Sequence, residues 1–470
     1  MTTSVELVAT TALIALMSAL GSAVLGYPAG NWLAGTTKRV RQLVTPLLLV
    51  PFLLPPFLIG LSLLPLQPLE INSQTGILWI IAAHLTMNIG FMARVVAALA
   101  VPAEQIEAAE LDQATKFQTR LRIELPQQLP GLTAASLLVA LYSATSFGLV
   151  LSLGRGQVDT LETEIVQLAL RELDLAGAAI LALAQTLLTL AMFWLASRLG
   201  ANPTPLFGYE GSRGSWPGLA VVVATGGSVL LIFWSVTQRA FSLNGGIVEN
   251  IRALSSQGAR DILNVSVLEA ASNSLRNMFV TLLIALPLAW FAAGRKRSNP
   301  IWLLPIGISP VVVGLAFLVA TGYLPAQLSG WWLLPVAQAV FVFPLGYQIL
   351  RPARAALPLE YLESARLDGA SRARVFQLIE LPVLAKPLAT AAAFSALGSL
   401  GEFGAASFLA YGSQTTLPLA IFRLAARPGQ ENLGMAMTAS LLLIVLAMVV
   451  VYFVAKESRS DSRPVVVALQ

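Results

Sequence analysis

The sequence predicts an all-α, polytopic membrane protein in which two similar sets of transmembrane helices follow one another along the chain. Hydrophobic residues make up 56% of the 470 residues and charged residues 11%, against about 25% charged in an ordinary soluble domain. Apolar runs of about 20 residues, the length that crosses a bilayer as a helix, recur along the chain. A charged stretch in the first half also returns in the second, which indicates an internal duplication.

The repeat is carried by two charged stretches in otherwise apolar surroundings. Glu107–Pro126 reads EAAELDQATKFQTRLRIELP, and 256 residues later Glu363–Pro382 reads ESARLDGASRARVFQLIELP. The same offset, with no gap, pairs Phe147-Gly148 with Phe403-Gly404 further along the chain. Each half of the chain is therefore expected to hold one charged loop at the same place in its order of helices.

Eleven apolar segments are long enough to be predicted as transmembrane helices. In the first half and the connector they are Val5–Ala34, Leu43–Leu66, Thr75–Ala100, Gly131–Leu153, Ala176–Ser197 and Pro217–Val236. In the second half they are Asn273–Gly294, Ile301–Tyr323, Trp331–Leu350, Pro387–Ala410 and Asn432–Ala455.

These helices predict three regions. Residues 1–200 form the first half with its charged loop at 102–126, and residues 273–470 form the second half with its loop at 358–382. Residues 201–272 form a connector with one extra helix and a long external segment, which either contacts an external partner or only connects the halves. Six predicted helices separate the two loops, so both loops lie on one face and the halves form a parallel, pseudo-two-fold repeat. The distribution of Lys and Arg favours the cytoplasm for that face, with the N-terminus outside.

Each charged stretch is predicted to be a short helix lying across the inner face of the membrane. Acidic residues come first and basic residues later, which complements a helix dipole, and prolines stand at both ends. Small alanine side chains leave a low surface on which another protein can dock. One such stretch alone could be an ordinary amphipathic loop, but two copies at equivalent positions favour a docking role.

Both stretches closely resemble the cytoplasmic loop of type I ATP-binding-cassette importer permeases. Glu107-Ala108-Ala109, Ile123 and Leu125-Pro126 fill the pattern in the first half, as do Glu363, Ala365, Gly369, Ile379 and Leu381-Pro382 in the second. Gln113 stands where that family has Gly, and Ser364 replaces its first Ala. The resemblance covers nearly the whole chain and implies the type I importer permease fold. It also implies that the loops are coupling helices, with contacts to ATPase subunits through Glu107, Ala108, Ala109, Gln113, Glu363, Ala365 and Gly369.

The resemblance also implies which partners the chain has. No G-x-x-x-x-G-K-[ST] motif is present, so ATP is expected to bind separate subunits, and the chain is not expected to be an enzyme or to hold a cofactor. One copy is expected to bind two ATPase subunits, together with an external or periplasmic binding protein. The absence of cysteine and the presence of a single His argue against sulfur or imidazole metal sites. The expected location is the bacterial inner membrane, with no removable signal peptide and no nucleic-acid partner.

The segments that follow each charged stretch are candidates for the translocation pathway or its gate. Ser146 and Gly148 in the first half, and Glu402 and Gly404 in the second, lie where small residues permit close packing or a break in a helix. A carboxylate within an apolar span is expensive and suggests a functional role. The alternative is a structural Glu402 that caps a broken helix or pairs with Gln338 or Gln348.

The expected substrate is a small cation, and thiamine is favoured over iron(III) by a resemblance of the loop segments to the thiamine branch of fused permeases. Tyr347, Trp331 and Trp332 either stack on a cationic ring or serve as packing and interfacial residues. His84 is expected to be a hydrogen-bonded core residue more than a proton site. The basic clusters at 38–41 and 295–297 are interpreted as topology signals and contacts to anionic membrane lipid. An ion-coupled secondary transporter is the alternative class, and a membrane enzyme is the weakest one.

Overall fold

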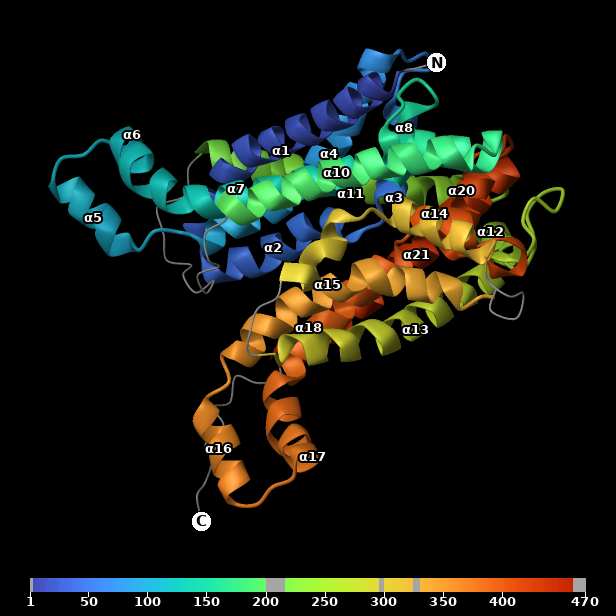
Figure 1. Cartoon of the computed structure of the whole chain (residues 1–470). Coiled ribbons are helices and arrows are strands. Elements are labelled where there is room, and N and C mark those ends of the chain that lie inside the picture. Colours follow the sequence, from blue (N-terminus) through green and yellow to red (C-terminus); the bar gives the residue numbers. More distant parts are fainter. Residues whose placement is uncertain (1–2, 200–215, 296–299, 324–329, 460–470) are drawn as a thin grey trace. The chain divides into compact units, whose positions relative to one another are not determined.

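The computed structural model describes residues 3–199, 216–295, 300–323 and 330–459. Every regular element in these ranges is a helix (Figure 1). The chain divides into two compact units, Met1–Ser242 and Leu243–Gln470. Part of the predicted connector, 200–215, and the basic residues Arg213, Lys296, Arg297 and Arg463 lie outside the described residues.

The first unit contains the helices up to the end of the predicted extra span. In order they are α1 (Ser4–Ala34), α2 (Lys38–Leu53), α3 (Pro56–Leu63), η1 (Leu64–Leu66), α4 (Ser73–Ala98), α5 (Ala103–Leu111), α6 (Lys116–Thr119), η2 (Arg120–Glu124), α7 (Leu125–Ala144), α8 (Phe147–Gly154), α9 (Leu161–Gln167), η3 (Leu168–Glu172), α10 (Leu175–Leu199) and α11 (Trp216–Ser242). Helix α11, the extra span of the predicted connector, packs on α1 and α2 of this unit.

The second unit repeats this order after one additional short helix. Its elements are α12 (Ile247–Ala253), α13 (Val267–Ala293), η4 (Pro300–Gly307), α14 (Pro310–Thr321), α15 (Leu333–Ala355), α16 (Leu359–Leu367), α17 (Arg372–Val375), η6 (Phe376–Glu380), α18 (Leu381–Leu400), α19 (Gly404–Leu409), η7 (Gly412–Gln414), α20 (Leu417–Ala425) and α21 (Gln430–Arg459). The contacts of α13 with α15 and α18 match those of α1 with α4 and α7.

Local sequence explains where the first helix of each unit begins. Thr3 accepts the backbone N–H of Glu6 while the Glu6 carboxylate accepts that of Thr3, and Ser266 and Glu269 form the same reciprocal pair at the start of α13. This capping box satisfies donors that the first turn of a helix leaves unpaired. The two capping boxes therefore fix the start of the equivalent helices α1 and α13.

Four of the predicted spans are broken helices, and one of them, Pro387–Ala410, consists of the end of α18 and of α19 with a break at 401–403. Lys38–Leu53 and Pro56–Leu66 meet at 96°, and Lys116–Ala144 and Phe147–Gly154 meet at 59°. At the first break Pro55 and Pro56 cannot donate hydrogen bonds to the preceding turn. The third break lies in the predicted span Ile301–Tyr323, which consists of the 3₁₀ helix η4 and the 12-residue α14, with Ser309 accepting the N–H of Val312 at the start of α14.

The fold class predicted from the sequence is confirmed, and the span count is refined. Among the described residues eight helices are long and apolar enough to cross a membrane, and the two bent pairs raise that number to ten. The expectation of Ile301–Tyr323 as one continuous span was wrong, because Pro305 and Pro310 divide it and leave α14 too short to span by itself.

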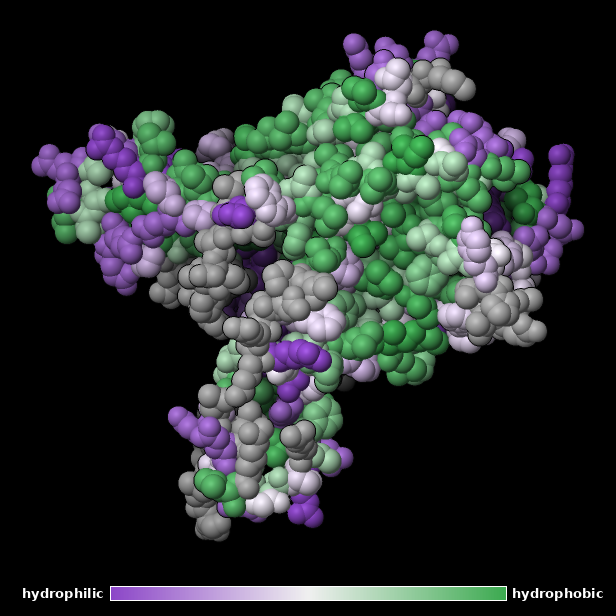
Figure 2. All heavy atoms as spheres, in the orientation of Figure 1, coloured by the Kyte–Doolittle hydropathy of each residue, from purple (hydrophilic) through white to green (hydrophobic). Residues whose placement is uncertain are grey.

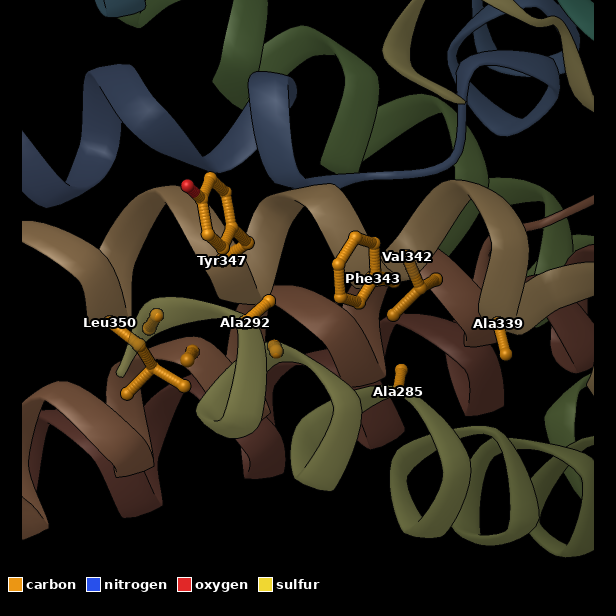
Figure 3. Packing of buried hydrophobic residues seen from close by; sticks show 10 residues of the cluster. Ala285, Ala292, Ala339, Val342, Phe343, Tyr347 and Leu350 are labelled. Atoms are coloured by element: carbon orange, nitrogen blue, oxygen red, sulfur yellow. The ribbon is translucent and has the colours of Figure 1, made fainter. Parts of the chain in front are cut away.

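Hydrophobic packing inside each unit uses small residues at the helix contacts. In the second unit Ala285, Ala289 and Ala292 of α13 pack on Val342 and Phe343 of α15, as Figure 3 shows from close by. Alanine lets two helix backbones approach closely, which suits helices that associate in an apolar solvent. Hydrophobic side chains also cover the sides of the long helices, where lipid is expected (Figure 2).

Candidate functional site

Two polar arms leave the helical bundles, one in each unit. The first arm, residues 103–124, comprises α5, α6 and η2, and the second arm, residues 359–380, comprises α16, α17 and η6. Figure 1 shows each as a hairpin beyond the long helices of its unit, and Figure 2 shows hydrophilic side chains gathered on both. All helix bounds in the second arm equal those in the first plus 256 residues. The repeat in the sequence is thus a repeat in the structure.

The first helix of each arm ends in the same turn. The backbone N–H of Ala114 donates to the carbonyl of Ala109 over 2.9 Å, and that of Ala370 donates to Ala365 over 2.9 Å. Such a bond over five residues closes a helix through a residue in the left-handed region. That residue is Gln113 in the first arm, at φ 60°, and Gly369 in the second, at φ 75°. The departure of Gln113 from the family pattern therefore leaves the turn unchanged.

The second helix of each arm begins with an equivalent hydroxyl cap. Thr115 and Gln118 bond each other's backbone N–H groups at the start of α6. In the second arm the Ser371 hydroxyl, 256 residues later, accepts the N–H of Arg374 over 3.4 Å. Because both the turn and the cap are repeated, the two arms present their first helices with the same backbone geometry.

The predicted docking residues differ in exposure. Those exposed on the arms are Glu107, Ala108, Gln113, Glu363 and Gly369, whereas Ala365 is half-buried and Ala109 is buried. The most exposed apolar side chains were not predicted: Leu111 is 85% exposed and Leu367 is 88% exposed. Both occupy the last position of the first helix, at the same place in the repeat. An apolar residue conserved between the two charged stretches is the signal that could have identified them.

A short π-helical segment joins each arm to the span that follows. The N–H of Leu125 donates to the carbonyl of Arg120, and the N–H of Leu381 donates to that of Phe376. A bond over five residues contains one residue more than an α-helical turn, and such segments are frequent at functional sites. The arms are therefore continuous with α7 and α18 through a turn of unusual width.

The predicted pathway residues lie at the breaks that follow α7 and α18. Ser146 and Gly148 stand at the start of α8, and Glu402 and Gly404 stand at the start of α19. The Glu402 carboxylate accepts the N–H of Ala405 over 2.5 Å and that of Ala406 over 3.1 Å. Glu402 thus caps a broken helix, which is the role that the sequence analysis gave as the alternative to a role in the pathway. The hydroxyl of Ser146, at the equivalent position, is buried with no hydrogen-bond partner.

Gln338 interacts with the Glu402 carboxylate, as the sequence suggested, and also belongs to a buried network beside this cap. Its Oε1 accepts the hydroxyl of Ser399 over 2.6 Å and that of Thr281 over 3.0 Å. Its Nε2 donates to the Ser399 carbonyl over 3.4 Å. The network ties α13, α15 and α18 together immediately before the break at Glu402. Buried polar groups that are satisfied in this way specify one arrangement of the helices.

Two of the predicted aromatic residues already contact arginines. Tyr347 is buried on α15 with its ring beside Phe343 (Figure 3), and the guanidinium of Arg351 lies 5.9 Å from the Tyr347 ring. The guanidinium of Arg276 lies 4.5 Å from the ring of Trp331. In the conformation described here both rings are therefore packed against side chains of the protein.

The single His lies in the core of the first unit. His84 is buried on α4, and its Nδ1 lies 3.1 Å from the hydroxyl of Ser18 on α1. This arrangement fits the prediction of a hydrogen-bonded core histidine. No group of three His, Asp or Glu side chains with metal-binding geometry is found in the part of the chain that the structure describes.

Comparison with known proteins gives a family match over both units. Residues 22–202 and 273–457 each match the family described as "binding-protein-dependent transport system inner membrane component". The chain is 28% identical over 222 residues to a putative molybdenum transport system permease protein of Bacillus subtilis, covering 43% of this chain and 96% of the relative. It is 29% identical over 217 residues to the molybdenum permease ModB of Escherichia coli, covering 41% and 94%. It is 25% identical over 398 residues to the thiamine permease ThiP of Salmonella typhimurium, covering 79% and 72%.

Proposed function

The chain belongs to the family of binding-protein-dependent transport system inner membrane components, and we propose that it forms the translocation pathway for a small cationic solute, with thiamine as the substrate. Family membership makes it a permease component of the inner membrane, whose partners are an ATPase and a binding protein. It is a non-catalytic component, since ATP hydrolysis belongs to the partner. Beyond family membership, we propose that one chain binds two ATPase subunits, that thiamine is the substrate, and that the residues named below have specific roles.

The observation that carries the proposal is the pair of arms. Each has a first helix closed by the same turn, followed by a capped second helix, at positions exactly one repeat apart. Two equivalent docking elements on one chain suit two ATPase subunits. The exposed Leu111 and Leu367 give each arm an apolar anchor of the type that dominates protein interfaces when it enters a pocket. Glu107 and Glu363 stand one helical turn before these anchors, and their charges are proposed to orient the docking partner.

The proposed mechanism moves the arms together with their spans. When ATP draws the two ATPase subunits together, each arm is displaced, and the π-helical segment passes this displacement to α7 or α18. The broken helices α8 and α19 follow directly after these spans, so Ser146, Gly148, Glu402 and Gly404 are proposed to shape the gate. Tyr347 on the neighbouring α15 is proposed to line the pathway in the state that admits substrate.

Thiamine is favoured by relatives that match the chain along most of its length. Thiamine permeases of Salmonella typhimurium and Brucella suis align over 79% and 80% of the chain, including both halves. The proposed domain organisation has two halves, 1–200 and 273–470, joined by a connector at 201–272. This organisation agrees better with the thiamine permeases, which align over most of the chain, than with the molybdenum permeases, which align over less than half of it.

Molybdate is the second candidate, for two reasons. The molybdenum permeases are 28% and 29% identical to this chain, against 25% for the thiamine permease. In addition, the carboxylate of Glu402 is occupied by two backbone N–H groups, so its charge is compensated within the protein and does not by itself favour a cation. A permease for an oxyanion is compatible with this arrangement.

Uptake into vesicles distinguishes these substrates. The permease is reconstituted with its cognate ATPase and binding protein, and labelled thiamine, molybdate and ferric iron are offered separately. We expect thiamine uptake that requires ATP and stops when the binding protein is omitted. Uptake of molybdate or iron alone would overturn the proposal that thiamine is the substrate. Uptake driven by an ion gradient without the ATPase would overturn the proposed mechanism.

A further inference from the structure

The root of the second arm is fixed to its bundle by an ion pair built around Arg354 of α15. Arg354 Nη2 lies 2.8 Å from Glu380 Oε2 at the end of η6, and Nη1 donates to the carbonyl of Trp290 on α13 over 2.8 Å. Only 16% of the Arg354 side chain and 17% of the Glu380 side chain are exposed. One guanidinium therefore joins the arm, α13 and α15.

Aromatic rings complete this joint. The guanidinium of Arg354 lies 4.6 Å from the ring of Trp290, and the Trp290 ring meets Phe376 of the arm edge-on at 5.4 Å. The contact between a guanidinium and a Trp face is attractive and is stronger where water is excluded. A cavity of about 430 Å³ lies beside the joint and is lined by Phe291 of α13 and by Ala370 and Val375 of the arm, among others.

The backbone of α13 leaves room for the guanidinium. A Cβ atom at Gly294 would lie 2.6 Å from Arg354 Nη1 and 3.0 Å from its Cζ. Real Cβ atoms essentially never show contacts under 3.0 Å, so a larger residue at position 294 would displace the Arg354 guanidinium from this position. The joint is built by residues from three separate elements.

The first unit cannot form the same joint. The residue that precedes Arg354 by one repeat is Ala98. Thr11 of α1 accepts the N–H of Leu161 as Ser274 of α13 accepts that of Leu417, so the counterparts of Trp290 and Gly294 in α1 are Tyr27 and Asn31. The equivalent of Glu380 is Glu124, which is also buried at the end of its π-helical segment, and whose Oε2 atom has no hydrogen-bond partner. The carboxylate is thus retained in both arms, while the arginine and the tryptophan are present only in the second.

From these contacts we propose that Arg354 is a positioning residue that makes the second arm move as one body with α13 and α15. The first arm, without this joint, turns more freely about its π-helical segment. The consequence for transport rests on the proposed function. The second arm would transmit the motion of its ATPase subunit directly to α13 and α15, whereas the first arm would turn with its own ATPase subunit and transmit less of that motion.

Spin labels test the mechanical part without substrate or ATPase. The chain has no cysteine, so labels attach only where cysteine is introduced. Leu367→Cys with Leu283→Cys reports the second arm against α13, and Leu111→Cys with Leu187→Cys reports the first arm against α10. All four side chains are exposed. We expect a narrow distance distribution for the second arm and a broad one for the first.

Arg354→Gln and, separately, Glu380→Gln are expected to abolish the narrow distribution of the second arm. Arg354→Lys, which keeps the charge, is expected to restore it in part. The matched change Glu124→Gln should leave the first-arm distribution as it is. Equal widths for the two arms in the unchanged protein, or a second arm that stays narrow in both Gln variants, would overturn the inference.

A second readout connects the joint to transport. In the assembled transporter, Arg354→Gln should lose stimulation of ATP hydrolysis by the binding protein while the ATPase still co-purifies with the permease. Undiminished stimulation would overturn the coupling role of Arg354. If no ATPase co-purifies with the unchanged permease, the proposed function fails, whereas the spin-label distances still decide the inference about the arm.

Discussion

The first arm, 103–124, and the second arm, 359–380, have the same helix bounds but differ in the residues that hold them. The turn after the first helix places Gln113 in the left-handed region in one arm and Gly369 in the other. At the root of the arm, Glu380 forms an ion pair with Arg354, whereas Glu124 Oε2 has no hydrogen-bond partner. Backbone geometry has thus been kept through the duplication while side-chain contacts have diverged.

The two units also differ in how closely their spans pack, and this difference gives the largest expected change in stability. Gly90 on α4 and Gly346 on α15 are one repeat apart. A Cβ at Gly90 would clash with the Leu48 carbonyl oxygen at 1.9 Å, whereas at Gly346 its nearest atom is Ala289 Cβ at 3.3 Å. We expect Gly90→Ala to destabilise the protein by about 3 kcal/mol or more through overpacking. The apparent melting temperature in detergent measures it.

Gly346→Ala is the matched control and is expected to change the melting temperature little. Each variant replaces one glycine of a long helix by alanine, which by itself favours the helix by about 1 kcal/mol. A similar loss in both variants would show that the two units are packed alike at these two positions.

A smaller effect is expected at the breaks after α7 and α18. Glu402→Ala removes the acceptor of two backbone N–H groups and should cost about 1–2 kcal/mol, as the loss of a helix cap does. Glu402→Gln keeps one acceptor oxygen and should cost less. Ser146→Ala removes a hydroxyl without a partner and should be close to neutral. Urea or thermal unfolding of the purified permease compares the three variants.

Transport by the same variants separates capping from recognition of charge. If Glu402 acts only as a cap, uptake by Glu402→Gln should follow the amount of folded protein in the membrane. Uptake that falls far below this amount in Glu402→Gln, with normal stability, would instead assign the negative charge a role in the pathway.

The turns of the two arms predict a reciprocal pair of changes. Gln113→Gly should stabilise the first arm by up to about 1 kcal/mol, because a side chain is unfavourable in the left-handed region. Gly369→Gln should destabilise the second arm by a similar amount. Amide hydrogen exchange within 103–119 and 359–375 reports each arm separately. Unchanged exchange in both variants would contradict this account of the turn.

The smallest effect is expected at the exposed ion pair of α12. Arg252 and Glu249 lie 3.6 Å apart, with 73% and 57% of their side chains exposed. Exposed pairs of this kind contribute about 0.5 kcal/mol or less. Glu249→Gln should therefore leave the melting temperature nearly unchanged, whereas Glu380→Gln should lower it measurably. Equal effects would mean that burial of the Arg354 pair contributes little.

The positions of the spans and of the arms could be predicted from the sequence because both depend on periodic and repeated features. The offset of 256 residues places α16, η6 and α18 from α5, η2 and α7 without error. The break within Ile301–Tyr323 was missed, although Pro305 and Pro310 signal it. An apolar run records burial in lipid and does not record whether the helix inside it is continuous.

Most contacts between distant residues could not be predicted. The sequence suggests Gln338 as a partner of Glu402, and the two side chains do interact. The further contacts of Gln338 with Thr281 and Ser399 depend on its position on α15 and were not predicted. Arg354 stands in a basic segment that the sequence explains by topology alone, and its pairing with Glu380 depends on the crossing of three helices. The exposure of Leu111 and Leu367 depends likewise on the direction in which each arm leaves its bundle.

The π-helical segments determine the direction in which each arm leaves its span, measured around the axis of α7 or α18. An α-helix rotates by about 100° per residue, so removing one residue from 120–124 or from 376–380 would convert the wide turn into a regular one and swing the arm around the axis of α7 or α18. The sequence of the arm would then be intact while its apolar anchor faced another direction. Deletions of one residue here should abolish ATPase binding more completely than any single substitution on the arm surface.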